Sequence, residues 1–431
     1  MRRFRYGAED FAARIERLSL SGEDAFSRVE GDVRAIIERV RAEGDDALID
    51  LTQEFDGVSL DAGSLVVGEE EMARALDALP AETLDALKLA EERIRAFHEA
   101  QLPRRINLEP APGERLSLEP TALASVGLYA PGGTAAYPST VLMNATPARA
   151  AGVDELVLCT PPGPDGEVPA AVLAAASLAG LARVVRVGGA QAVAAMAYGT
   201  QSVPRVDKIV GPGNVYVAAA KRIVRGRVEI DKEAGPSEVV VLLDDPALAE
   251  WAAADLLAQA EHDAQAMAVG VCLGADVADV LEGEMESQLR AAARSAEMAQ
   301  ALENRGAIIE VGSREEALAV AEMLAPEHLE ILMERAEEAA GEIRNAGAVF
   351  CGPWSPVPLG DYIAGPNHVL PTGGAARFAS PLGVYDFIKW TSRVCFDAAA
   401  AARLAEPAAR LADLEGLSAH ARALRLRRGA S

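Results

Sequence analysis

The chain has 431 residues, half of them apolar and a quarter charged, which is normal for a soluble globular protein of two or three domains. Its formal net charge is −24 at pH 7, so long-range repulsion disfavours nucleic acid and anionic membrane surfaces as partners. The N-terminal residues are basic but are not followed by an apolar stretch, and no later segment is long and apolar enough to span a bilayer. We therefore expect a cytoplasmic protein.

The first part of the chain, residues 1–125, is mostly amphipathic and helical in pattern. Residues 33–55 and 90–101 carry apolar side chains at three- and four-residue spacing. We expect this part to be a helical lead-in that packs on the first α/β domain.

Short apolar runs then alternate with helical ones, which predicts βαβ units around a parallel sheet. The strand-like runs 155–162, 183–189 and 206–213 are each followed by an alanine-rich helical run. The pattern restarts at 238–245 and continues through 266–274 and 307–312. We predict an α/β protein with a first α/β domain at 126–236 and a second at 237–372, both Rossmann-like but incomplete parallel-sheet domains.

The last part, residues 373–431, begins with turn-rich sequence and ends in a helical pattern. This helical tail is too short to form a core of its own, so it must dock on another surface.

Histidine is the most informative residue type because the chain has five: His98, His262, His328, His368 and His420. In LLAQAEHD, Gln259 and His262 are three residues apart, so on a helix their side chains leave the same face and can converge on one ion. A two-ligand pair is a weak indication by itself, and it needs partners from other segments.

Two later strings supply such partners. LGDYIAGPNHVLPT contains Asp361 and His368 in a stretch that we expect to be ordered but not helical, and EGLSAH contains Glu415 and His420. Nitrogen and oxygen ligands without thiolate suit zinc, manganese or iron, and zinc with an open position is the commonest choice.

The string LAPEHLEIL raises a separate question about Glu327 and His328. We predict that Pro326 occupies a first helical position and that the pair lies in the first helical turn. There the helix dipole would lower the pKa of the imidazole and favour a neutral general base. A plain acidic N-terminal turn fits the spacing equally well, so both readings stay open.

The indications of a cofactor are ambiguous. A strict G-x-G-x-x-G fingerprint is absent, and the glycine turns at 188–191 and 211–214 follow strand-like runs. Such turns let a backbone approach a phosphate at a helix N-terminus, but they also simply connect strands to helices.

Taken together, these strings resemble the histidinol dehydrogenase family over nearly the whole chain. The resemblance is carried by GLYAPGGTAAYPSTVLMNATPARAAG, VGGAQAVAAMAYGT, VDKIVGPGN, AGPSEV, AEHD, APEHLE, GDYIAGPNHVLPT and EGLSAHARA, all in family order. So many long strings make the match highly specific.

The resemblance implies L-histidinol as substrate, oxidised with NAD and zinc to L-histidine. It implies that Glu327 and His328 are the catalytic acid/base pair and that zinc is bound by Gln259, His262, Asp361 and His420. It further implies NAD contacts by Tyr129, Gln191 and Asn214, and substrate contacts by Ser237, His368 and Glu415 together with His328 and the zinc ligands.

The implied assembly is a homodimer in which the tail of each subunit completes the neighbour's site, so His420 would bind the partner's zinc. The family usually shows Met at Lys232, Glu at Val357 and Arg at Trp390. None of these three departures falls on an implied ligand or catalytic position.

The sequence leaves three alternative functions open. A paralogue of the same fold could oxidise another small polyol or a sulfonated alcohol with NAD. A zinc hydrolase could use Glu327 to activate a metal-bound water, and a non-catalytic binding protein would leave the filled catalytic positions unexplained.

Overall fold

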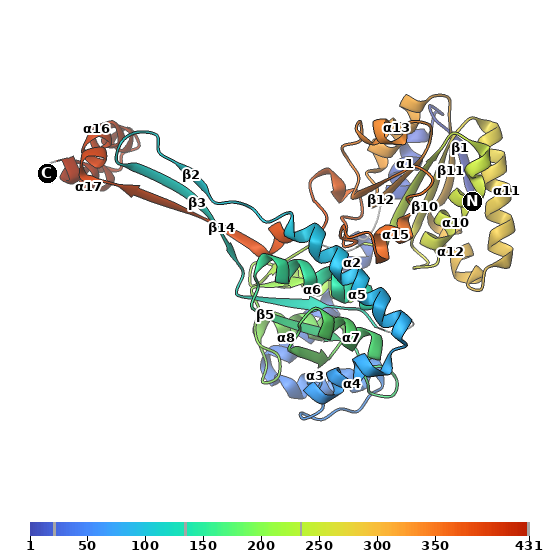
Figure 1. Ribbon diagram of the computed structural model, residues 1–431, viewed down its shortest axis with the longest axis horizontal. Helices are drawn as coiled ribbons and strands as arrows, with labels where there is room; N and C mark the ends of the chain where they lie inside the picture. The colour runs from blue at the N-terminus through green and yellow to red at the C-terminus, as the bar shows by residue number, and fades with distance from the viewer. Residues whose placement is uncertain (20–22, 133–135, 233–234, 429–431) are drawn as a thin grey trace.

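The computed structural model describes residues 1–19, 23–132, 136–232 and 235–428. Two parallel sheets, each covered by helices, form the body of the molecule, and a long arm that ends in two helices projects from it (Figure 1). This architecture confirms the predicted α/β fold with two parallel-sheet domains. Within the described residues, no helix is long and apolar enough to cross a membrane.

The first sheet has the strand order β6-β5-β4-β7-β8, and all its neighbours are parallel. Numbered along the chain, this is order 3-2-1-4-5, the Rossmann order without its sixth strand. The strands are β4 (Ser125–Tyr129), β5 (Glu155–Thr160), β6 (Arg183–Arg186), β7 (Lys208–Val210) and β8 (Glu229–Ile230). The connecting helices are α6 (Pro138–Ala151), α7 (Ala170–Leu178), α8 (Gly189–Tyr198) and α9 (Val215–Val224).

Four helices of the lead-in pack on the helices of this first sheet. Helix α2 lies against α8 and α9, α4 against α7, and α5 against α6. Their apolar faces and the sheet side chains form two continuous cores. The four are α2 (Glu23–Glu43), α3 (Asp45–Asp56), α4 (Glu69–Ala78) and α5 (Ala81–Glu99).

The second sheet repeats the 3-2-1-4-5 order in β11-β10-β9-β12-β13 and adds β1 at its edge. Its strands are β9 (Glu238–Leu243), β10 (Met267–Leu273), β11 (Gly306–Val311), β12 (His328–Leu332) and β13 (Ala348–Cys351). Its α-helices are α10 (Ala249–Ala260), α11 (Ala275–Ala291), α12 (Ser295–Arg305), α13 (Arg314–Leu324), α14 (Ala336–Ala340) and α15 (Val357–Tyr362), and a short 3₁₀ turn, Pro246–Leu248, precedes α10.

The start of the chain corrects one expectation. Strand β1 (Arg2–Arg5) pairs with β11, and helix α1 (Phe11–Ser19) packs against α13, so this part of the lead-in lies on the second domain and not on the first. The reason is apolar burial, because Phe4, Phe11 and Leu18 enter the core of the second sheet. The division of the chain at residues 126, 237 and 373 stays a prediction.

The arm joins segments from both ends of the sequence. Strand β3 pairs with β2 and with β14 in an antiparallel sheet, and α16 packs on α17 at its tip (Figure 1). The tail is therefore helical at its end but begins with short 3₁₀ turns, Ala375–Arg377 and Val384–Phe387, and a strand. The elements are β2 (Ile106–Leu108), β3 (Glu114–Ala122), β14 (Ile388–Phe396), α16 (Ala398–Leu414) and α17 (Ser418–Arg428).

Candidate functional site

The residues expected to contact a dinucleotide lie at the carboxyl ends of the first sheet. Tyr129 ends β4, Gln191 lies in the first turn of α8 after β6, and Asn214 caps α9 after β7. The Asn214 side chain accepts hydrogen bonds from Tyr216 N (3.0 Å) and Val217 N (3.2 Å), which fixes the glycine turn before the helix. This edge is where open α/β sheets usually bind ligands.

Two polar side chains at this edge are buried. Gln191 is 1% exposed, and among the described residues neither its amide oxygen nor its amide nitrogen has a hydrogen-bond partner. The Tyr129 hydroxyl accepts a hydrogen bond from Gly189 N at 3.1 Å, and burial raises its pKa to about 12, so the phenol stays neutral. A buried amide without partners is costly, so this place fits a polar ligand group.

The second group of residues lies at the opposite, amino edge of the second sheet. Ser237 directly precedes β9, Glu327 directly precedes β12, and His328 is the first residue of β12. Because β9 and β12 are parallel neighbours, these three residues come together at one edge. Gln259 and His262, at the end of α10 and in the turn that follows, belong to the same end of the domain.

The expected helix over LAPEHLEIL is wrong. Helix α13 ends at Leu324, Ala325 takes a left-handed conformation (φ 47°), and residues 328–332 form the buried strand β12. Pairing with β9 and β13 satisfies the backbone of this run, so tertiary context overrides the helix-start pattern after Pro326.

The groups around His328 raise the pKa of its imidazole, whereas the predicted helix terminus would lower it. Its Nδ1 lies 3.0 Å from the Glu238 carbonyl, which can only accept, so Nδ1 carries a proton and Nε2 is left as the second site. Nε2 is 3.5 Å from Asp361 Oδ1, and Nδ1 is 3.5 Å from Glu327 Oε2. Burial lowers the pKa of His328, but these two carboxylates outweigh it and hold the pKa well above its ordinary value.

Among the expected metal ligands of the body, His262 interacts electrostatically with the carboxyl of Asp361. Burial raises the pKa of this carboxyl, but His328, His368 and His262 outweigh it and the pKa is lowered. Gln259 is 3% exposed, and its amide nitrogen has no partner among the described residues. An amide binds a cation through its oxygen and not through this donor nitrogen, so the imidazole of His262 and the carboxylate of Asp361 are the groups that fit an ion with nitrogen and oxygen ligands.

The loop that carries Asp361 and His368 is partly helical, contrary to expectation, because Asp361 lies in the short helix α15. His368 follows in irregular backbone, and its Nδ1 lies 2.8 Å from the Asp361 carbonyl. Burial lowers the pKa of His368, which favours a neutral imidazole with Nε2 as its free acceptor.

The tail residues do not join this group within the chain. Glu415 ends α16, His420 lies in α17, and both are exposed. The arm holds them at the far end of the molecule's longest axis from the second domain (Figure 1). Accordingly, the described residues contain no cluster of three or more His, Cys, Asp and Glu side chains that could hold a metal.

Two residues of the site were missed from the sequence. Glu238 contacts both members of the pair through its main chain, since its N–H donates to Glu327 Oε2 at 2.9 Å. Asn367 is 4% exposed and donates to Met143 O at 2.6 Å, which ties the His368 loop to α6. Both adjoin predicted site residues in sequence, and this adjacency was the available signal.

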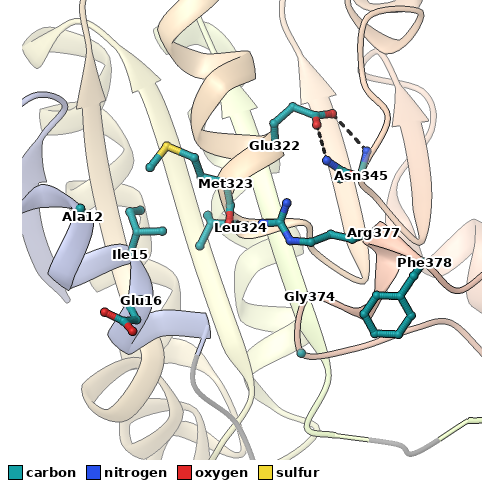
Figure 2. A pocket seen from close by; sticks show the side chains of 11 residues that line it. Ala12, Ile15, Glu16, Glu322, Met323, Leu324, Asn345, Gly374, Arg377 and Phe378 are labelled. Atoms are coloured by element: carbon teal, nitrogen blue, oxygen red, sulfur yellow. Dashed lines mark hydrogen bonds between the residues drawn. The ribbon is translucent and has the colours of Figure 1, made fainter.

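A surface hollow of about 700 Å³ lies elsewhere, between α1, the end of α13 and residues 373–378. Figure 2 shows Phe378 and Arg377 at one side of it, and Glu322 bonded to Asn345. None of the expected site residues lines it. The hollow therefore lies apart from both groups of expected site residues.

Comparison with known proteins points to one family over nearly the whole chain. The family model described as histidinol dehydrogenase matches residues 20–428. A histidinol dehydrogenase of Aromatoleum aromaticum is 49% identical over 97% of this chain and 95% of its own length, and one from Synechococcus is 47% identical over 96% of each. A crystal structure of histidinol dehydrogenase from Elizabethkingia anophelis superposes with a TM-score of 0.93 at 34% identity, covering 99% of this chain and 98% of that one.

Proposed function

This chain belongs to the histidinol dehydrogenase family, and we propose that it oxidises L-histidinol to L-histidine through L-histidinal, with two NAD molecules per substrate and one zinc ion per subunit. It is an oxidoreductase of histidine biosynthesis, and we expect it to work in the cytoplasm. The observation that carries the proposal is the pairing of Glu327 with His328 beside Asp361 at the amino edge of the second sheet.

We assign the zinc ion to Gln259, His262 and Asp361 of one subunit and to His420. The interaction of His262 with Asp361, whose pKa is lowered, supports the body's share of this site. When bound, zinc would hold the substrate and orient its carbinol carbon. Ser237, His368 and Glu415 would bind the rest of the amino alcohol.

We assign the NAD contacts to Tyr129, Gln191 and Asn214. The buried amide of Gln191 offers a donor and an acceptor without partners among the described residues, and the carboxyl edge of a 3-2-1-4-5 sheet is the usual dinucleotide position. When bound, NAD would accept the hydride that leaves the substrate carbon.

In the first oxidation, His328 would take the hydroxyl proton while the carbon loses hydride. The Glu238 carbonyl keeps the Nδ1 proton in place, so Nε2 is the accepting atom. The negative charges of Glu327 and Asp361 stabilise the imidazolium that results. If Asp361 is engaged by the metal, its pull on the imidazole weakens, and the neutral base becomes available nearer neutral pH.

In the second oxidation, Glu327 would remove a proton from the water that adds to the aldehyde, and hydride would then leave the hydrate to give the carboxylate. Glu327 is 6% exposed and held by the Glu238 N–H, so its oxygen is oriented before substrate arrives. No thioester is needed for this sequence.

The separation of His420 from the body supports a homodimer with exchanged tails. The arm exposes apolar side chains, among them Val394 (63%), Leu411 (64%) and Leu414 (85%), which a second subunit would cover. Each site would then combine one subunit's body with the other subunit's tail.

The test is the stoichiometry of NADH formation from L-histidinol, with and without a chelator. We expect two NADH per L-histidinol, loss of activity on chelation and recovery with zinc. One NADH with accumulating aldehyde would contradict the proposal, and oxidation of another alcohol in preference to histidinol would favour the paralogue.

Two variants test the division of roles. His328→Asn should chiefly slow oxidation of the alcohol, by roughly 100-fold or more, because it removes the base. Glu327→Gln should chiefly slow oxidation of supplied L-histidinal. Equal losses of both variants in both assays would contradict this division.

A further inference from the structure

The main chain of Glu238 holds both members of the catalytic pair. Its N–H donates to Glu327 Oε2 (2.9 Å), and its C=O accepts from His328 Nδ1 (3.0 Å). The main chain of one residue thus orients the Glu327 carboxylate and fixes the tautomer of His328. Any rotation of the peptides that flank Glu238 would move both catalytic side chains together.

The side chain of Glu238 is locked in a buried ion pair. Its Oε1 lies 3.0 Å from Arg305 Nη2, and the two residues are 1% and 6% exposed. Among the described residues, Oε2 has no hydrogen-bond partner, so Arg305 provides the main anchor. Breaking such a pair leaves an uncompensated buried charge.

Arg305, the last residue of α12, is itself fixed from several sides. It donates to Leu18 O through Nε (3.1 Å) and Nη2 (2.6 Å), and to Gln265 O through Nη1 (3.1 Å). Leu18 belongs to α1, so the N-terminal helix supports the pair. This contact gives a physical role to the finding that α1 lies on the second domain.

The charges around the Glu238 carboxyl are Arg305 from α12 and Glu327 from the segment before β12. Burial raises the pKa of Glu238, Arg305 lowers it and Glu327 raises it, with a net pKa of about 7. The carboxyl of Glu238 is therefore electrostatically linked to Glu327 as well as joined to it through the main chain.

We propose that Glu238 and Arg305 are positioning residues for the catalytic pair: their buried ion pair fixes the backbone that orients Glu327 and His328. This inference rests on the proposed roles of that pair. Glu238 and Arg305 would lie behind the catalytic pair and support it, and neither would bind substrate or hold the metal.

The test compares Glu238→Gln, Arg305→Met and the double variant with the unchanged enzyme. Each single variant should lower kcat roughly tenfold with L-histidinol and with L-histidinal, while NAD affinity and metal content stay unchanged. The double variant should be little worse than either single one, because both remove one interaction. Additive losses would overturn the inference.

A spectroscopic measurement separates positioning from general destabilisation. The His328 Nδ1–H resonance reports the hydrogen bond to the Glu238 carbonyl, so it should shift in Glu238→Gln if the ion pair fixes this backbone. The matched control is Glu71→Gln, which breaks a part-buried ion pair with Arg186 in the first domain. The control should lose stability but keep kcat and the His328 Nδ1–H resonance.

The outcomes are distinguishable. If Glu238→Gln behaves like Glu71→Gln, with normal kcat and an unmoved His328 Nδ1–H resonance, the positioning role is wrong. If Arg305→Met does not fold, Glu238→Gln alone decides, because it keeps the shape of the side chain. Failure of the unchanged enzyme to oxidise histidinol would contradict the proposed function, and the His328 Nδ1–H resonance, compared between Glu238→Gln and unchanged protein, would still test the positioning.

Discussion

The two parallel sheets share one strand order, 3-2-1-4-5, yet their candidate sites lie at opposite edges. The first sheet gathers Tyr129, Gln191 and Asn214 at its carboxyl edge, and the second gathers Ser237, Glu327 and His328 at its amino edge. A second difference is that the site at the second sheet is incomplete within one chain. Its predicted metal set includes His420, which the arm holds far from the second domain. Topology alone therefore does not locate chemistry; the residues at each edge do.

The largest expected effect tests whether the tail of one subunit completes the site of the other. With supplied L-histidinal, Glu327→Gln and His420→Asn should each be nearly inactive, but co-refolding them should restore roughly a quarter of normal activity, since half of the dimers are mixed and one of their two sites carries no lesion. The measurement is NADH formation after the heterodimer is verified by mass.

The control for that experiment mixes Glu327→Gln with Gln191→Leu, two lesions on the body. Every site of a mixed dimer then keeps one lesion, so activity should stay absent. No recovery in the first mixture would show that the tail serves its own chain, and recovery in this control would show that one site combines residues of both bodies.

The next effect separates the two edges. His262→Asn should weaken zinc binding by more than the roughly 10–100-fold that loss of an outer partner causes, and leave NAD binding intact. Gln191→Leu should weaken NAD binding and leave the metal content intact. Metal analysis and NAD titration of both variants check this, and a variant that loses both ligands would blur the distinction between the edges.

A smaller effect concerns the core of the second sheet, where Glu330 on β12 faces Asp255 on α10. Burial and the Asp255 carboxyl raise the pKa of Glu330 to about 9. A raised carboxyl pKa means that the folded state holds a proton the unfolded state releases, so stability falls as pH rises from about 4.5 towards 9. Glu330→Gln should therefore gain about 1–3 kcal/mol at pH 8 and flatten this dependence.

Denaturant titrations at pH 5, 7 and 9, chosen as about the range in which the pair titrates, measure this effect. Asp255→Asn should flatten the pH dependence as well, because either change removes the shared proton. An unchanged slope in both variants would mean that the pair does not titrate in this range.

The smallest expected effect concerns Lys232, which contacts segments that follow much later in the chain. Lys232, at a position where the family usually has Met, donates to Val369 O (3.0 Å) and Ser380 O (2.7 Å). Burial lowers its pKa, so the gain from two hydrogen bonds is offset by desolvation. Lys232→Met should change the free energy of unfolding by less than about 1 kcal/mol.

The comparison for this variant is Lys208→Met, which leaves the Asp386 carboxylate without its ammonium partner. Thermal unfolding should show the larger loss in Lys208→Met. A larger loss in Lys232→Met would mean that this junction is a main support between the domains.

Sequence patterns predicted much of the fold because the spacing of apolar residues reflects local secondary structure. Alternating strand and helix runs gave both parallel sheets, and the glycine turns before Gln191 and Asn214 lie where they were expected. The strand at His328 was misread because a proline before a short apolar run resembles a helix start, and only pairing with β9 and β13 decides otherwise. The pairing of β1 with β11 and the arm depend on contacts between distant segments, which no local pattern encodes.

Strand β1 has a consequence for synthesis. Arg2 to Arg5 leave the ribosome long before their partner strand, which begins with Gly306 and whose Ala307 pairs with Arg2. The first sheet and its covering helices are complete once residue 230 has emerged, so that domain can fold while the chain is still growing. The opening strand must wait unpaired for most of translation, and three arginines among its four residues keep that waiting edge from pairing with other nascent chains.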